Sequence, residues 1–338
     1  MSEPCFRHIP VLLAEVVASA PTNSQSLLDC TLGGAGHSQA LLKKFPKATL
    51  YGIDRDPTAL AASRHRLAEF PGVTAIEQAS FLELSYWAER WNTSFDFILA
   101  DLGMSSEQLA APERGFSFLQ EGPLDMRMDP FRQVETAAQV LQQRSEFEIR
   151  RLLQTYGEER FAPQIARAIV KHRANTPLVT TRDLAELVER VIPRKFQKPN
   201  FHPATQTFQA LRMEVNQEPE EINALLDFAI ENLRPGGRLA IISFHSLEDR
   251  PVKQRFREWE RPCRCPSDLP RCVCGRQALG VSLQRKPIVA GAEEIEQNPR
   301  SRSARLRVFE RNAVCFPGSD KESEDRNGQE GKPGCDHQ

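Results

Sequence analysis

A glycine-rich turn near the N-terminus, between a strand pattern and a helix pattern, constrains the fold of this chain most strongly. Residues 27–37 read Leu-Leu-Asp-Cys-Thr-Leu-Gly-Gly-Ala-Gly-His. Gly33, Gly34 and Gly36 allow the backbone to approach a ligand where a side chain would collide with it. A strand, a glycine turn and a helix in this order predict an α/β fold with a ligand site at the edge of its sheet.

Strand and helix patterns alternate along most of the chain. Strands are predicted at residues 26–30, 48–53, 73–76, 95–99 and 238–243, and helices at residues 37–44, 57–70, 80–91 and 221–233. Strands joined by helices of this length imply a parallel sheet with right-handed crossovers. A late strand at residues 304–310 is predicted to close the sheet as an antiparallel edge. The fold class is therefore α/β, with a mostly parallel, Rossmann-like sheet.

The middle of the chain interrupts this pattern. Residues 103–130 predict a long loop rich in glycine, proline and charge, and loops of this length are usually functional or disordered. Apolar residues then recur at helical spacing, which predicts an all-helical insert at residues 135–215 that serves as a substrate domain. The α/β domain would comprise residues 1–134 and 216–315, and the polar tail 316–338 is predicted to be disordered.

Two aspartates that follow predicted strands indicate the kind of ligand. Asp54 ends a strand 21 residues after Gly33, where a carboxylate can accept hydrogen bonds from both hydroxyls of a ribose. Asp101 ends another strand, and the carboxyl ends of parallel strands share one edge. Gln39 replaces the third glycine of the dinucleotide fingerprint, which disfavours a pyrophosphate. A nucleoside cofactor fits this set best, and an ordinary turn with surface aspartates is the alternative.

Ten stretches of the chain, spread between residues 7 and 311, resemble the ribosomal RNA small subunit methyltransferase H family. One of them reads HPATQTFQALR, and another reads GPLDMRMD. The matching stretches are residues 8–13, 31–38, 52–57, 101–109, 114–118, 122–129, 156–161, 202–212, 236–250 and 298–311. They occur in order with few gaps, which makes the resemblance far more specific than a glycine turn alone.

The resemblance implies a class I methyltransferase domain with an inserted helical domain. It implies transfer of a methyl group from S-adenosyl-L-methionine to the exocyclic N4 of a cytidine in the decoding region of 16S rRNA, within the small ribosomal subunit. The residues that it implies for cofactor binding are Ala35, Gly36, His37, Asp54, Phe81, Asp101 and Gln108. No catalytic base is assigned, because Asp-Leu-Gly-Met at residues 101–104 replaces the Asp/Asn-Pro-Pro-aromatic loop of many amino-methyltransferases.

Two departures from the family pattern bear on these assignments. Ala35 stands where glycine is usual, and we expect this change to be acceptable only if the φ of Ala35 is negative. Ala110 and Ala111 replace an acidic pair, which weakens a catalytic role for carboxylates at those positions.

The loop around residue 115 is a candidate for binding the target base, which must leave its stack to reach a buried methyl group. Arg114 and Phe116, with Phe118, could bind the base through phosphate contact and stacking. The alternative is that these aromatic side chains pin the loop onto the core. His245 falls at the same sheet edge, where a structural hydrogen bond is expected.

Charge is unevenly distributed along the chain. The net charge is −1, but residues 160–215 carry 10 Lys and Arg against 4 Asp and Glu, net +6, and residues 250–311 carry 15 against 7, net +8. These segments could contact a phosphate backbone, or they could be solvated helix faces. Because neither a membrane span nor a signal peptide is predicted, we expect a cytoplasmic protein with reduced thiols. The sequence does not indicate an oligomeric state.

Four cysteines crowd into one short segment, at Cys263, Cys265, Cys272 and Cys274. Four thiolates can bind zinc tetrahedrally, but structural sites commonly place two residues between paired cysteines, and here there is one. We therefore predict no metal site, with zinc as the alternative.

Two other classes of protein share parts of this pattern. An NAD-dependent oxidoreductase has the glycine turn and the acidic residue, but does not explain the missing third glycine or the loop at residues 103–129. A ribosome-assembly factor with a vestigial pocket would use the basic segments alone. Binding of S-adenosylhomocysteine rather than NAD tests the first alternative, and loss of methylation in an Asp54 variant tests the second.

Overall fold

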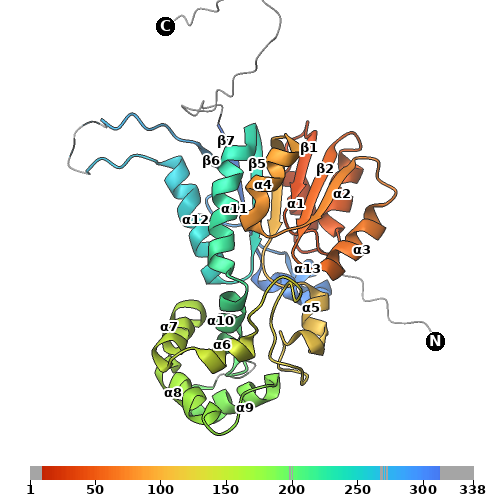
Figure 1. The fold of residues 1–338 in the computed structure, drawn as a ribbon. Coiled ribbons are helices and arrows are strands. Elements are labelled where there is room, and N and C mark those ends of the chain that lie inside the picture. Colours follow the sequence, from red (N-terminus) through yellow and green to blue (C-terminus); the bar gives the residue numbers. More distant parts are fainter. Residues whose placement is uncertain are drawn as a thin grey trace, which may run out of the picture.

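The computed structural model describes residues 10–312, except positions 198, 200, 267, 268, 270 and 272. The tail predicted at residues 316–338 lies outside the described residues. A sheet unit and a helical unit lie one above the other (Figure 1). Within the described residues, no helix is long and apolar enough to cross a membrane.

Seven strands form one sheet in the order β3-β2-β1-β4-β5-β7-β6. The strands are β1 (Ser26–Asp29), β2 (Thr49–Asp54), β3 (Val73–Gln78), β4 (Phe95–Asp101), β5 (Leu233–Ser243), β6 (Gly280–Ser282) and β7 (Arg305–Arg311). β1 to β5 pair in parallel, whereas β7 pairs antiparallel with β5 and β6. The predicted α/β class and the antiparallel late strand are confirmed. The predicted edge is wrong, because the three-residue strand β6, too short to leave a sequence pattern, lies beyond β7.

Buried side chains of the sheet alternate between two cores, one on each face. In β4, Phe95, Ile98 and Ala100 belong to one core, and Phe97 and Leu99 belong to the other. Helices covering the first core are α4 (Leu84–Trp91), α11 (Glu218–Asn232) and α12 (Ser246–Glu260), and those covering the second are α1 (Leu13–Ser19), α2 (Gly36–Lys44) and α3 (Pro57–Leu67). Because both faces are covered, the central strands are apolar on both sides.

The helical unit has a core of its own. Its helices are α6 (Ala137–Gln143), α7 (Glu146–Gly157), α8 (Ala162–Arg173), α9 (Thr181–Val191) and α10 (Thr205–Val215). Phe116, Leu124 and Met126, from the chain before α6, are buried in the same core. The unit therefore uses loop residues that precede the boundary predicted at residue 135. Capping boxes begin α6, α7 and α9 and fix where these helices start.

Six short helical elements complete the described fold. They are η1 (Phe81–Glu83), α5 (Ser106–Ala110), η2 (Pro112–Arg114), η3 (Arg194–Phe196), α13 (Ala292–Gln297) and η4 (Pro299–Ser303). Two of them, α5 and η2, lie in the segment predicted as one long loop, which is therefore partly helical.

Asn216 ties this loop to the junction between α10 and α11. Its side-chain Nδ2 donates to the backbone oxygens of Met126 and Arg212, each at 2.8 Å. Its Oδ1 accepts from the backbone N–H of Met128, also at 2.8 Å. Asn216 is fully buried, so water cannot replace these hydrogen bonds if the amide is removed.

We expect Asn216→Ala to lower the free energy of unfolding by about 2 kcal/mol or more, because each buried group left unpaired costs about 1–3 kcal/mol. Urea unfolding measures this change. The matched control is Asn223→Ala, since Asn223 is exposed and donates to the Pro219 oxygen within its own helix. That control should change stability by less than about 0.5 kcal/mol. Equal effects of the two substitutions would contradict the proposed role of Asn216.

Candidate active site

A cavity of about 880 Å³ opens where the carboxyl ends of β1, β2 and β4 meet. Its size lies in the range of small-molecule sites. Most of the residues predicted to bind the cofactor line it, namely Gly36, His37, Asp54, Phe81, Asp101 and Gln108. The sheet therefore brings together residues that are far apart in the sequence, and their role in binding remains a prediction.

Ala35 is the predicted residue that does not line the cavity, although the turn that holds it does. Its φ is +57°, so the condition under which we expected alanine to be acceptable here is not met. The residue is fully buried in the core between the sheet and α2, and a left-handed conformation costs alanine roughly 1–2 kcal/mol. Gly36 is constrained more strictly, because a Cβ there would lie 2.2 Å from Cγ of Pro10.

Asp54 is held at the end of β2 with both carboxylate oxygens oriented. Oδ2 accepts from the backbone N–H of Gly33 at 2.8 Å, and Oδ1 accepts from that of Asp56 at 2.8 Å. Burial raises the pKa of Asp54 to about 6, although these two hydrogen bonds lower it in part. At neutral pH the group is a carboxylate, and its binding to ribose hydroxyls remains a prediction.

Asp101 lines the same cavity and carries one buried acceptor that has no partner in the described part of the chain. Its Oδ1 is buried and has no hydrogen-bond partner among the described residues, while its backbone N–H donates to Thr31 Oγ1 at 2.7 Å. Burial, and then repulsion from Asp29 and Glu248, raises the pKa of Asp101 well above its ordinary value. A buried carboxylate is stable when a donor or a cation pairs with it. The residues therefore fit S-adenosylmethionine, which is an adenosine that carries a sulfonium and an ammonium group.

Gln108 lines the cavity, but both ends of its amide are already engaged. Its Nε2 donates to Asp56 Oδ2 at 3.0 Å, and its Oε1 accepts from the backbone N–H of Ser105 at 3.0 Å. The second contact belongs to the capping box that begins α5. The side chain therefore positions α5 against the chain that follows Asp54, and direct cofactor binding by Gln108 stays a prediction.

Arg114 and Phe116, the predicted substrate residues, do not line the cavity. Arg114 forms an ion pair with Asp56 at 2.7 Å and also donates to the backbone oxygen of Met128 at 2.9 Å. Phe116 is buried in the core of the helical unit. Phe118 stacks on His202, with ring centroids 4.4 Å apart. This placement agrees with the alternative that the loop is pinned to the core, and it gives no support to base binding by these side chains.

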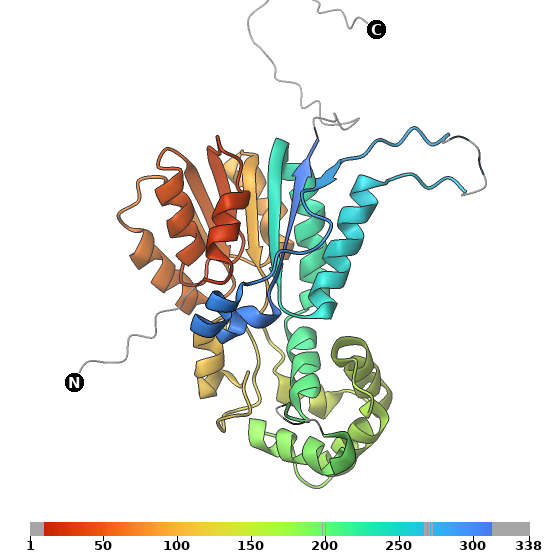
Figure 2. The ribbon, with the colours of Figure 1, turned by 180° about the vertical axis from the view of Figure 1, so that it is seen from behind.

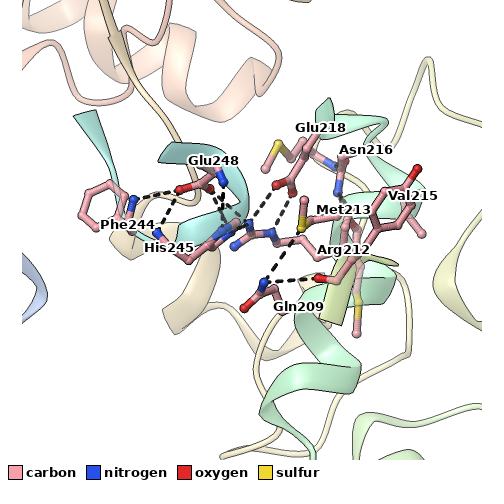
Figure 3. Close-up of polar contacts among 12 residues, drawn as sticks. Gln209, Arg212, Met213, Val215, Asn216, Glu218, Phe244, His245 and Glu248 are labelled. Atoms are coloured by element: carbon pink, nitrogen blue, oxygen red, sulfur yellow. Dashed lines mark hydrogen bonds and ion pairs between the residues drawn. The ribbon is translucent and has the colours of Figure 1, made fainter. Parts of the chain in front are cut away.

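A buried charge cluster in the cavity wall, drawn in Figure 3, was not predicted as a unit. Arg212 pairs with Glu218 at 2.7 Å and with Glu248 at 3.4 Å, and its Nη2 lies 3.1 Å from His245 Nε2. Glu248 Oε2 also accepts from the backbone N–H of Phe244 at 2.8 Å. Since the guanidinium lies among these groups, the cluster is a satisfied ion-pair network rather than a cation site.

The sheet order and the cavity together define a class I methyltransferase that uses S-adenosylmethionine. Residues 5–312 match the MraW methylase family. The chain belongs to this family.

Three relatives of known name are similar to this chain over most of its length, and each is called ribosomal RNA small subunit methyltransferase H. The relative from Trichlorobacter lovleyi is 47% identical over 309 residues, covering 90% of this chain and 98% of its own. The relative from Heliobacterium mobile is 46% identical over 310 residues, which cover 90% of this chain and 99% of the relative. The relative from Symbiobacterium thermophilum is 45% identical over 306 residues, which cover 90% of this chain and 96% of the relative.

The raised pKa of Asp54 predicts how cofactor affinity depends on pH. Above pH 7 the carboxylate is charged, and it is protonated as the pH falls through about 6. We expect the affinity for S-adenosylhomocysteine to be constant above pH 7 and to fall by up to about tenfold per pH unit below 6. Titration calorimetry between pH 5 and 8 measures this dependence.

Asp54→Asn is the matched control for this measurement. It should bind at least about tenfold more weakly at pH 7.5, because a hydrogen bond to a charged group contributes about 1.5–3 kcal/mol. Its affinity should vary less steeply with pH between 5 and 8 than that of the unmodified protein, because only Asp29 and Asp101 then contribute to the dependence. A variant with the pH dependence of the unmodified protein would show that another group controls binding.

Proposed function

We propose that this protein transfers a methyl group from S-adenosylmethionine to the exocyclic N4 of a cytidine in 16S rRNA. The observation that carries the proposal is the cavity at the strand ends, which is lined by Asp54 and by Asp101, whose Oδ1 is buried and unpaired among the described residues. An exocyclic amine brings hydrogen-bond donors, so an acceptor in the cavity suits it. Family membership supports the same reaction, because the named relatives are small subunit rRNA methyltransferases.

Different residues of the cavity would orient the cofactor and accept the proton. When bound, S-adenosylmethionine supplies an electrophilic methyl group. The glycine turn and Asp54 would orient the adenosine, and such positioning supplies much of the reduction in the barrier. Asp101 would accept a hydrogen bond from N4, concentrate electron density on the nitrogen, and take the proton that the amine loses. Burial raises the pKa of Asp101, so its carboxylate is a stronger base than that of an exposed aspartate.

A cysteine in the cavity wall supports N4 rather than a ring carbon as the methyl acceptor. Transfer to C5 of cytosine proceeds through attack by a thiolate on the ring, and a thiol is a weak nucleophile until it is deprotonated. Cys30 lines the cavity, but burial, and then the charge of Asp29, raises its pKa well above the ordinary value. The sulfur therefore remains a protonated thiol at neutral pH.

We propose that the RNA substrate approaches this cavity. Met128, from the loop before the helical unit, and Arg300, from η4, line the cavity, whereas the buried guanidinium of Arg212 is occupied by its ion pairs with Glu218 and Glu248. Residues 160–215 carry a net charge of +6 and residues 250–311 carry +8, which favours binding to phosphates. We place the substrate in the small ribosomal subunit and the protein in the cytoplasm with its ribosomes.

Mapping of rRNA nucleosides by mass spectrometry tests the reaction. Small subunits that lack the modification are incubated with the protein and isotope-labelled S-adenosylmethionine, and the rRNA is digested and sequenced by mass. We expect one labelled N4-methylcytidine in the decoding region. A label on C5, on a ribose or on another base would contradict the proposal.

Variants tested in the same assay distinguish the role of Asp54 in cofactor binding from the role of Asp101 in proton transfer. Asp54→Ala should raise the KM for S-adenosylmethionine by about 10–100-fold, the loss expected for hydrogen bonds to a charged group. Asp101→Asn should lower kcat by about 10²–10⁴-fold, the usual contribution of general acid–base catalysis. Glu113→Gln is the control, because Glu113 is exposed and does not line the cavity, and it should leave both constants unchanged. Full activity of Asp101→Asn would exclude the proposed proton transfer.

A further inference from the structure

Between α12 and β6, the described residues of positions 261–278, called here the arm, form an outgoing and a returning stretch without helix or strand. The arm projects away from both units of the molecule (Figures 1 and 2). None of its described residues is buried, so this part of the arm has no hydrophobic core. A segment without a core needs another constraint, such as a disulfide or a metal, to hold one conformation.

Three cysteines from the two sides of the arm converge at one point. The Sγ atoms of Cys263, Cys265 and Cys274 all lie within 4.8 Å of one another. Sulfur ligands of a tetrahedral zinc ion are roughly 3.8 Å apart, given Zn–S bonds of about 2.3 Å. Small side-chain rotations would therefore bring all three sulfurs onto one ion.

A backbone hydrogen bond already points at one of these sulfurs. The backbone N–H of Val273 donates to Sγ of Cys265, with an N···S distance of 3.4 Å. This contact joins the outgoing side of the arm, at Cys265, to its returning side, at Val273. The neighbouring arginines, Arg264 and Arg271, are exposed and would offset the negative charge of a metal–thiolate centre.

We propose that Cys263, Cys265 and Cys274 bind a structural zinc ion that fixes the arm. Thiolates are soft ligands and select zinc over magnesium or calcium. The single residue between paired cysteines led us to predict no metal. The two sides of the arm nevertheless lie close enough to bring the sulfurs of Cys263, Cys265 and Cys274 within 4.8 Å of one another. Cys272, the remaining cysteine of the cluster, lies outside the described residues. The site is remote from the cofactor cavity, whose lining includes no residue of the arm.

Metal analysis of the full-length protein tests this site. The protein is expressed with added zinc, purified under reducing conditions, desalted, and measured by plasma mass spectrometry. We expect about one zinc ion per chain in the unmodified protein. The double variant Cys265→Ser/Cys274→Ser should contain less than about a tenth of that amount. Cys30→Ala is the matched control, because Cys30 lies outside the arm, and it should retain the zinc.

Cobalt substitution gives a second readout that does not depend on the folding of a variant. Cobalt(II) bound by thiolates in a tetrahedral site shows intense visible bands and a thiolate-to-metal charge-transfer band, and we expect both in the unmodified protein. Circular dichroism of each variant checks that the two units remain folded.

Three results would overturn the proposal. The first is unmodified protein without stoichiometric zinc and without the cobalt bands. The second is equal zinc in the unmodified protein and in a folded double variant. The third is a disulfide among the arm cysteines in protein kept under reducing conditions, detected as a mass two hydrogens lower after alkylation.

Discussion

The burial of several acidic side chains at one edge of the sheet is the constraint on which the rest of the structure depends. Parallel strands bring Asp29, Asp54 and Asp101 to that edge. Burial raises the pKa of Asp29 and of Asp54 to about 6, and the charge of Asp29 adds to the effect of burial on Asp101. Carboxylates gathered in a region of low dielectric constant are costly unless a cation shares the site. A nucleoside with a sulfonium and an ammonium group meets this need, whereas NAD would bring two further negative phosphates.

The helical unit is joined to this edge through a small number of buried polar contacts. Arg212, near the end of α10, neutralises Glu218 and Glu248 in the cavity wall, and Asn216 fixes the neighbouring loop. Arg114 connects the same loop to Asp56, two residues after Asp54. Removing one member of a buried ion pair costs about 3–5 kcal/mol, so these contacts hold the two units in one arrangement. A substrate bound between the units would thus meet a cofactor site that is already formed.

The sequence predicted those features that depend on local pattern, and it did not predict those that depend on distant contacts. Alternating strands and helices defined the sheet, and the spacing of Asp54 after the glycines placed it in the cavity. The positive φ of Ala35 could not be predicted, because packing in the core overrides the preference of alanine. Arg114 was expected to contact substrate, but its partner Asp56 is 58 positions away and gives no local signal. The charge cluster around Arg212 was also not predicted, because Arg212 and Glu248 are 36 positions apart in the sequence.

The most direct test of the cavity as a site for a cationic nucleoside is a crystal structure of the protein with S-adenosylhomocysteine. The ribose hydroxyls should lie within hydrogen-bond distance of the Asp54 carboxylate, and the sulfur of the ligand should lie beside Asp101, with Oδ1 of Asp101 left for the N4 amine of the substrate. A ligand bound elsewhere, or one that contacts neither aspartate, would contradict the assignment of this cavity as the active site.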